Sequence, residues 1–171
     1  MTEEVRRLID KEAIRDLLCA YCRSIDRRDM ALLRSLVLPD AQFDYGVFSG
    51  TASEFADFAG RALANVGPTH HNLTTAIIRV EGDIAESESY CIAVHGEVLT
   101  ESELTDLVVY LRYIDSFVRH DGLWKIARRL VIYDWNQNPP KTALWDGPRH
   151  KAYRPRGGVK ADDPSQERFF L

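Results

Sequence analysis

The hydrophobic pattern of this 171-residue chain changes its period near residue 66, and this change limits the possible fold more than any other feature. Before that point, apolar residues recur at spacings of three and four, which is typical of helices with one buried face. After it, four long stretches rich in β-branched and aromatic residues are separated by turn signals. Helices that precede an antiparallel sheet predict the α+β class.

Three helices are expected in the first part of the chain. The second covers residues 30–38, with Asp29 as its N-cap and Pro39 as its stop, and the third covers residues 51–66. Between them, residues 41–48 are predicted to form a short strand that Gly46 breaks. The first helix covers residues 5–25, and its buried face is predicted to hold Val5, Leu8, Ile9, Ile14, Leu17, Leu18, Tyr21, Cys22 and Ile25.

The second part of the chain predicts an antiparallel meander of four strands, with the three helices covering one face of a strongly curved sheet. Turn signals at Gly82-Asp83, at residues 100–105 and at residues 120–122 separate the strands. Several strands carry apolar residues on both faces, so the outer face needs a second cover. The simplest cover is another subunit, and we expect a homodimer or a higher homo-oligomer. The predicted strands are residues 70–80, 85–99, 105–120 and 123–136.

Composition excludes several classes of protein. The 26 acidic residues outnumber the 22 basic ones, and the basic residues are scattered, which argues against a nucleic-acid partner. The charged N-terminus and the absence of a long apolar run predict a cytoplasmic protein without a membrane partner. Cys19 and Cys22 form a C-x-x-C inside a helical pattern, where packing of small thiols is favoured over a redox or metal role.

Residues 137–171 show no periodicity and are rich in proline, glycine and charge. We expect one folded domain over residues 1–136, followed by an irregular C-terminal extension. This extension is either disordered or docked on the pocket mouth or on a neighbouring subunit. Four residues of the kind usually buried favour docking, and they are Trp145, Tyr153, Phe169 and Phe170.

Two positions stand out as candidate catalytic groups. Asp26 lies about 40° around the first helix from Cys22, at the edge of the buried face, where a carboxylate either faces the core or stays solvated. His70 and His71 are adjacent on a predicted strand, so only one of them can face the interior. The alternation of side chains along the strand does not show which of the two histidines faces the interior.

Further candidates lie on the strands. His95 shares a face with the small residues Ser87, Ser89, Cys91 and Ala93, which would leave room for a cavity. Arg119 is either a site residue or a surface charge at a strand end. Five aromatic residues with polar tips suit a pocket lining and are equally ordinary in a core, and they are Tyr21, Tyr45, Tyr113, Tyr133 and Trp135.

Three stretches resemble the SnoaL-like branch of the nuclear transport factor two-like superfamily. They are "EAIRDLLCAYCRSIDRRDMALLRSLVLPDAQFDYG", "THHNLTTAIIRVEGDIAESESY" and "RYIDSFVRHDGLWKIARRLVIYDW", and the resemblance extends over residues 8–136. It implies a cone-shaped α+β barrel whose mouth opens into a deep apolar pocket. Members include scytalone dehydratase, bile acid 7α-dehydratase, hexachlorocyclohexane dehydrochlorinase, polyketide cyclases and lyases acting on aromatic lignin fragments.

The resemblance also implies roles for individual residues. In the eliminating enzymes, an Asp at the end of the first helix orients a His that abstracts a proton, which corresponds to Asp26 and His71. His71 lies twelve residues before Asp83, as the family spacing requires, and is therefore expected to point inward. By similarity to individual members, four further residues receive catalytic roles, and they are Tyr21, Tyr45, His95 and Arg119. Tyr113, Tyr133 and Trp135 are expected to bind the substrate.

These groups can perform acid–base chemistry without a cofactor or a metal, because a neutral imidazole is a suitable base near neutral pH. We expect a cofactor-independent lyase, most simply a dehydratase, acting on a hydroxylated cyclic or aromatic small molecule. A carbon–carbon lyase, an isomerase or a cyclase would use the same groups. A non-catalytic ligand-binding subunit is the alternative from another class, and a separation of more than about 6 Å between Asp26 and His71 would favour it.

Overall fold

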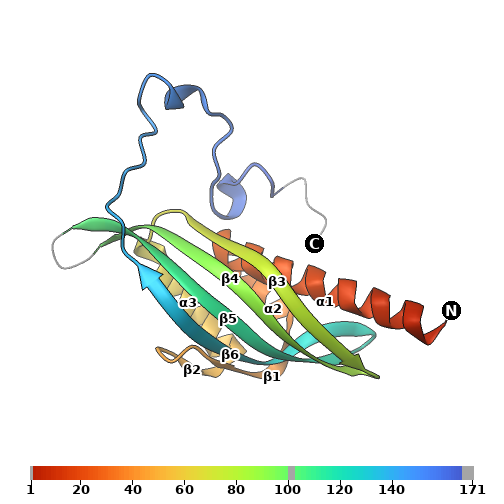
Figure 1. Cartoon of the computed structure of the whole chain (residues 1–171). Helices are drawn as coiled ribbons and strands as arrows, with labels where there is room; N and C mark the ends of the chain where they lie inside the picture. Colours follow the sequence, from red (N-terminus) through yellow and green to blue (C-terminus); the bar gives the residue numbers. More distant parts are fainter. Residues whose placement is uncertain (1, 100–102, 167–171) are drawn as a thin grey trace.

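The computed structural model describes residues 2–99 and 103–166. Three helices come first, interrupted by two short strands, and four long strands follow (Figure 1). The elements are α1 (Glu3–Asp26), α2 (Met30–Ser35), β1 (Val37–Asp44), β2 (Ser49–Thr51), α3 (Ala52–Ala62), β3 (Thr69–Glu81), β4 (Ile84–Leu99), β5 (Leu104–His120) and β6 (Leu123–Gln137), with 3-10 turns η1 (Leu63–Asn65), η2 (His150–Ala152) and η3 (Lys160–Asp162).

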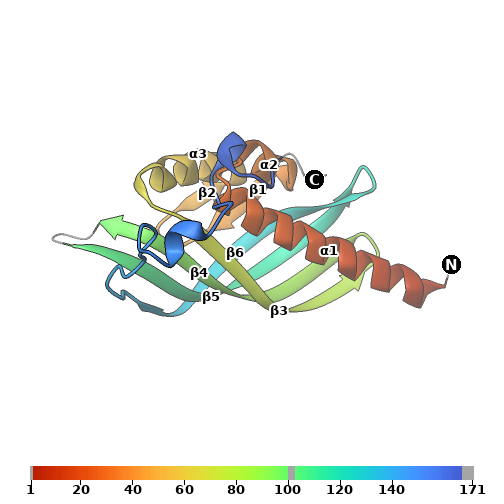
Figure 2. The same cartoon turned by 90° about the horizontal axis from the view of Figure 1, so that it is seen from above.

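The six strands form one curved sheet in the order β2-β1-β6-β5-β4-β3. All neighbouring strands are antiparallel except β1 and β6, which run parallel. The three helices lie on the same side of the sheet (Figure 2). The sheet stays open, so β2 and β3 are its edges. This arrangement confirms the predicted α+β architecture of three helices on a strongly curved, mainly antiparallel sheet.

Helix α1 begins two residues earlier than its apolar pattern indicates, because the Thr2 side chain caps its first turn. Its buried face starts only at Asp10 and Ile14 and continues to the helix end. The prediction that this face includes the first turns is wrong, since Val5, Leu8 and Ile9 are 47–61% exposed. These turns project beyond the sheet (Figures 1 and 2), which leaves them without a packing surface.

Helix α2 is shorter than predicted. It starts at its N-cap Asp29 as expected, but it ends at Ser35 instead of continuing to Leu38. The residue before a proline disfavours helical geometry, and the carbonyl of Leu36 instead accepts the N–H of Ile126. Strand β1 therefore begins at Val37, and a register shift between Val37 and Gln42 accommodates Pro39 in the sheet.

The predicted helix over residues 51–66 is α3 followed by the turn η1. Thr51 and Glu54 form a capping box at its start. The predicted strand over residues 41–48 is replaced by the longer β1, a turn at Gly46 (φ +71°) and the short strand β2. Beyond this point the prediction is accurate, because the four long strands agree with β3 to β6 to within one residue at each end.

Four β-bulges interrupt the long strands and change which residues face the helices. They lie between Leu73 and Ala76 on β3, between His95 and Val98 on β4, between Ile126 and Arg128 on β6, and between Tyr133 and Trp135 on β6. Each bulge inserts one extra residue, so the inward-facing set changes parity there. On β3, for example, Ile78 is buried, whereas Ile77, which shares parity with His71, is 61% exposed.

The core lies between the helices and the concave face of the sheet. Helix α1 contributes Ile14, Leu18 and Tyr21, and the predicted row of small residues on β4 faces inward, with Ser87, Ser89, Cys91 and Ala93 all buried. No helix of the described residues is long and apolar enough to cross a membrane.

After β6 the chain leaves the sheet, contains only the turns η2 and η3, and returns to α1 (Figure 1). Trp145 and Tyr153 are about half exposed, so they do not anchor this extension. Phe169 and Phe170 lie outside the described residues. The contacts that hold the extension on α1 are polar instead, and they involve Arg27 and Asp163.

Candidate functional site

Asp26 and His71 contact each other at the junction of α1 and β3. The Nδ1 atom of His71 lies 2.7 Å from Oδ1 of Asp26, and the backbone N–H of His71 donates to Oδ2 at 2.9 Å. Both side chains are at least 92% buried, since their exposed fractions are 7% and 8%. His70 points the other way and is exposed. The strand therefore directs His71 inward, as the family spacing implied.

The carboxyl group of Asp26 is held in its ionised form. Burial opposes ionisation, but the hydrogen bonds and the charge interaction with His71 outweigh it, and the pKa of Asp26 is below its ordinary value. An ionised carboxylate only accepts hydrogen bonds, so the proton of a neutral His71 ring resides on Nδ1. Its Nε2 atom then keeps a free lone pair, which is the arrangement a general base requires.

A cavity of about 230 Å³ lies beside this pair, between α3 and the sheet. Its walls are mostly apolar and aromatic, and the polar groups that reach it are histidine and tyrosine side chains. Five of the predicted site residues besides His71 line it: Tyr21, Tyr45, His95, Tyr113 and Tyr133. The apolar walls are Ile25, Phe55, Phe58, Ala59, Ala62, Leu63, Ala93, Leu107, Val109 and Leu111.

Two tyrosines meet at the cavity wall. The hydroxyl groups of Tyr21 and Tyr45 are hydrogen-bonded to each other, although they come from α1 and from the turn after β1. The Tyr45 ring stacks on Phe55 at 4.3 Å, and its carbonyl accepts the hydroxyl of Tyr133. Burial raises the pKa of Tyr45 to about 12 and also raises that of Tyr21. Both hydroxyl groups are therefore protonated near neutral pH and can donate hydrogen bonds.

A buried cation lies directly behind the tyrosines, and sequence reasoning missed it. The guanidinium carbon of Arg129 lies 3.8 Å from the centre of the Tyr21 ring and 4.0 Å from that of Tyr113. Arg129 pairs with Asp115 through two hydrogen bonds of 2.7 Å, and both side chains are fully buried. The charge of Arg129 opposes the effect of burial on the tyrosine pKa values.

A signal for this pair existed on one of the two strands. Asp115 has the same parity as Leu111, Tyr113 and Phe117, so a charge on an apolar face of β5 could have been noticed. The bulge before Arg128 hides the corresponding signal on β6. Two of the three guanidinium nitrogens of Arg129 donate to Asp115, and the third, Nη1, makes no hydrogen bond within the described part of the chain.

His95 lies next to His71 in the wall of the cavity, on the neighbouring strand. The two rings meet edge to face with centroids 5.5 Å apart. Burial and the neighbouring His71 lower the pKa of His95 to about 4, so this ring is neutral near neutral pH. Its Nδ1 atom is buried and has no hydrogen-bond partner among the described residues. Of the row of small residues that shares its face, only Ala93 lines the cavity, and the others lie deeper in the core.

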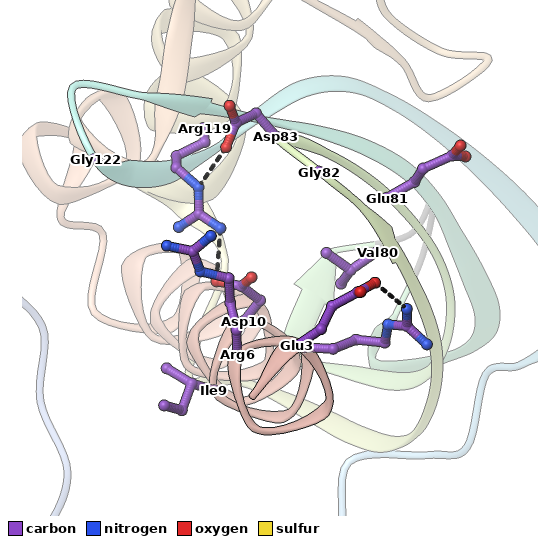
Figure 3. A pocket seen from close by; sticks show the side chains of 11 residues that line it. Glu3, Arg6, Ile9, Asp10, Val80, Glu81, Gly82, Asp83, Arg119 and Gly122 are labelled. Carbon is purple, nitrogen blue, oxygen red and sulfur yellow. Dashed lines mark hydrogen bonds and ion pairs between the residues drawn. The ribbon is translucent and has the colours of Figure 1, made fainter. Parts of the chain in front are cut away.

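The structure does not bring Arg119 to this cavity. Strand β5 places it six residues beyond Tyr113, about 20 Å along the strand. There it donates to Asp10 at 2.7 Å and to Asp83 at 2.8 Å (Figure 3). Its guanidinium group also lies over the Trp124 ring, 4.5 Å from the ring centre. These contacts tie the first half of α1 to the β3–β4 turn. We therefore correct the expected catalytic role of Arg119 to a structural one at the opposite end of the sheet.

Trp135 is also outside the cavity. The bulge between Tyr133 and Trp135 changes the face on which the strand presents its side chains. Trp135 therefore lies on the outer face, where it stacks on Tyr110 at 4.1 Å, and is 53% exposed. Tyr133, on the other side of the bulge, lines the cavity as expected.

Within residues 2–99 and 103–166, no group of three histidine, cysteine, aspartate or glutamate side chains is arranged to hold a metal ion. Cys19 is exposed and Cys22 is buried in the core.

Comparison with known proteins agrees with this description. Residues 6–130 match the model of the SnoaL-like domain family. An uncharacterized protein of Mycobacterium tuberculosis (strain ATCC 25618 / H37Rv) is 31% identical over 129 residues, which are 74% of this chain and 86% of the relative.

Solved structures share the fold at low sequence identity. A hexachlorocyclohexane dehydrochlorinase of type 2 superposes with a TM-score of 0.73 at 21% identity, covering 83% of this chain and 97% of the other. A candidate scytalone dehydratase from Novosphingobium aromaticivorans gives a TM-score of 0.68 at 21% identity, covering 80% and 96%. The family match covers most of the sheet and all three helices, and the chain belongs to the SnoaL-like family.

Proposed function

We propose that this protein is a cofactor-independent lyase that removes water from a hydroxylated cyclic or aromatic small molecule. The observation that carries the proposal is the 2.7 Å contact between Asp26 and His71 beside an apolar cavity. Two of the solved structures with this fold are named for related eliminations, a dehydrochlorinase and a candidate scytalone dehydratase. A non-catalytic binding subunit has no need for an ionised carboxylate buried against a histidine ring.

Each group has a definite part in the proposed reaction. The Nε2 atom of His71 takes a proton from a carbon next to a carbonyl, and Asp26 stabilises the imidazolium that forms. One of the two hydrogen-bonded hydroxyl groups of Tyr21 and Tyr45 donates to the other, which in turn donates to the carbonyl oxygen as it gains negative charge, and Arg129 behind them favours that charge. The carbon–oxygen bond on the neighbouring carbon then breaks, a double bond forms, and the hydroxyl leaves with a proton as water.

The proton for the departing hydroxyl comes from the same site. The imidazolium of His71 returns the proton that it took, so the enzyme ends in its starting state and no external acid or base is consumed. His95 is neutral and next to His71, so we place it beside the leaving hydroxyl as a hydrogen-bond partner.

The size of the cavity limits the substrate to one ring. A cavity of about 150 Å³ is large enough to bind benzene, so about 230 Å³ accommodates a six-membered ring with a few small substituents. Its walls favour a neutral, largely apolar molecule, since Phe55, Phe58 and Leu107 offer no hydrogen bonds. We therefore propose single-ring compounds with a hydroxyl group two carbons from a carbonyl carbon.

The experiment is a turnover assay on a panel of such compounds, with a chelator present throughout. Formation of the conjugated double bond is followed by ultraviolet absorbance, and exchange of the acidic C–H for deuterium is followed by NMR in deuterated water. We expect both signals from the wild type and from His70→Ala, and neither from His71→Ala. Exchange without elimination would favour an isomerase or a cyclase, and absence of both signals across the panel would favour a binding subunit.

A further inference from the structure

The end of the described chain returns to the helix that carries Asp26. We call residues 157–166 the tail segment. The Nη1 atom of Arg27 donates to the Gly158 carbonyl at 2.7 Å and to Oδ2 of Asp163 at 2.8 Å. The backbone N–H of Lys160 donates to the Arg27 carbonyl at 2.8 Å. The tail segment therefore hydrogen-bonds to both the side chain and the main chain of the residue that follows Asp26.

Asp163 organises the tail segment. Its carboxylate accepts the backbone N–H groups of Gly158 and Ser165, each at 2.9 Å, and the hydroxyl of Ser165. These hydrogen bonds hold the pKa of Asp163 well below its usual range, so it is ionised near neutral pH. The side chains of Asp163 and Arg27 are only 6% and 19% exposed, so salt screens this pair weakly.

The contacts lie at the C-terminal end of α1. The residues that follow the helix cap its last turn, since the N–H groups of Arg27, Arg28 and Asp29 donate to the carbonyls of Arg23, Ile25 and Ser24. Arg27 is the C-cap of α1, and its own carbonyl accepts a hydrogen bond from the tail segment. One turn earlier, Arg23 donates to the hydroxyl of Ser165 at 3.0 Å. The tail segment thus fixes the last turn of α1 from outside, while His71 fixes the Asp26 carboxylate from inside.

The tail segment also borders the dyad directly. A hollow of about 500 Å³ lies on the outer side of Asp26 and His71, and Ser165 forms part of its wall together with Arg23 and Arg27. The tail segment therefore lies within the same hollow as Asp26 and His71 and borders the side of the dyad that faces away from the cavity.

We propose that the tail segment is a positioning element for the dyad and that Asp163 is its central positioning residue. The segment holds the last turn of α1 so that the Asp26 carboxylate keeps its two contacts with His71. The inference extends the proposed function and relies on it for the catalytic readout alone. A helix end released by about 1 Å would misplace the carboxylate relative to the histidine.

The test compares two variants that disturb the tail segment with one that does not. Asp163→Asn removes the charge that pairs with Arg27. Gly158→Ala changes no charge, but its new Cβ would lie 2.7 Å from the Asp162 carbonyl oxygen, so the loop must open. The matched control is Asp57→Asn, which removes the same charge from an exposed ion pair with Arg34.

The first readout is hydrogen exchange of the His71 backbone amide, which donates to Asp26. We expect both tail variants to lower its protection by about tenfold, the effect of losing a helix-end contact, while Asp57→Asn leaves it unchanged. Unchanged protection of His71 in variants whose Lys160 amide has become unprotected would overturn the inference. This readout needs no substrate, so its outcome is independent of the proposed reaction.

The second readout is kinetic. With a compound that the wild type converts, we expect both tail variants to lower kcat by about tenfold with little change in KM, because the pocket walls are untouched. A rise in KM with unchanged kcat would overturn the positioning role. Reduced protection of His71 in a protein that converts no compound of the panel would support the positioning element and contradict the lyase.

Discussion

The carboxylate of Asp26 contacts His71 twice, through the ring nitrogen Nδ1 at 2.7 Å and through the backbone N–H at 2.9 Å. The two contacts fix the imidazole relative to its own main chain. An aspartate that held only the ring would allow the strand to shift beneath it. This double contact explains why the helix end and the strand act as one unit, and it determines how substitutions should behave.

Asp26→Asn should abolish catalysis while preserving the fold. The amide oxygen can accept the His71 backbone N–H, but the amide NH₂ group then faces Nδ1 and forces the ring proton onto Nε2. We expect kcat to fall by roughly 10²–10⁴-fold, and the same for His71→Ala. The double variant should be little worse than the poorer single one, because either change disables the pair. A steady-state assay checks this, and additive losses would contradict a shared role.

His95 should make the protein less stable in acid. Its folded-state pKa of about 4 lies below the value of about 6.5 expected in the unfolded chain. Between these values the unfolded state binds a proton that the folded state does not, so the free energy of unfolding decreases as pH falls from 6.5 towards 4. The contribution of His95 at pH 4.5 should be a loss of about 2 kcal/mol.

Urea denaturation at pH 7 and pH 4.5 measures this loss. In His95→Gln the decrease between the two pH values should be smaller than in the wild type by that amount. His70→Gln is the control, since His70 is exposed on the other face of the strand. An equal pH dependence in the His95 variant and the wild type would mean that folding does not lower the pKa of His95.

The buried pair of Asp115 and Arg129 should be costly to break and much less costly to replace. Removing one partner leaves a buried charge without compensation, so Asp115→Leu or Arg129→Met should lower the free energy of unfolding by about 3–5 kcal/mol. The double variant Asp115→Leu with Arg129→Met should lose less than either single change. Urea denaturation of the four proteins completes the cycle, and a double variant that loses the sum of both would contradict it.

A partly exposed arginine on the outer face of the sheet provides a comparison for the buried pair of Asp115 and Arg129. Arg112 pairs with Glu88 and Asp134, and these side chains remain 26–36% exposed. Arg112→Met should therefore cost much less than Arg129→Met, because solvent replaces the lost partners.

We also propose that the outer face of the sheet packs against a second copy of the chain. Tyr90 is 44% exposed there, Ile92 and Val94 are half-buried, and Tyr110 stacks on the exposed Trp135. Sedimentation at micromolar concentration should give at least twice the chain mass of 19.5 kDa, and Ile92→Asp should shift the protein to monomer. Sedimentation of the wild type as a monomer alone would refute this proposal.

Regular alternation explains which features could be predicted from the sequence. The apolar residues of α1 repeat with the 3.6-residue period of a helix wherever this helix faces the core, so the buried stripe from Ile14 to Ile25 could be predicted. The four long strands and the row of small residues on β4 follow for the same reason, since no bulge interrupts β4 between Ser87 and His95. Choosing His71 over His70 required the family spacing. Alternation along a strand shows that the two side chains point to opposite faces, but it does not show which of them points inward.

The errors are concentrated where the pattern is broken by tertiary contacts. Bulges on β6 moved Trp135 out of the cavity and brought Arg129 into the core, and no local signal indicates a bulge at Asp134 or Ala127. Arg119 has a residue type suited to catalysis, but the length of β5 separates it from the dyad. The docking of Asp163 on Arg27 joins positions 136 residues apart through polar groups, so an apolar pattern could not reveal it.

Strand β3 is an edge of the open sheet. An edge strand exposes main-chain N–H groups that invite pairing with another chain. At His71 that N–H group donates to the Asp26 carboxylate, which stands where the carbonyl of a neighbouring strand would otherwise accept it. A member that has lost all activity would still need this acceptor to protect its sheet from aggregation. An aspartate at this position is therefore evidence of the fold, and only together with the inward histidine does it become evidence of an enzyme.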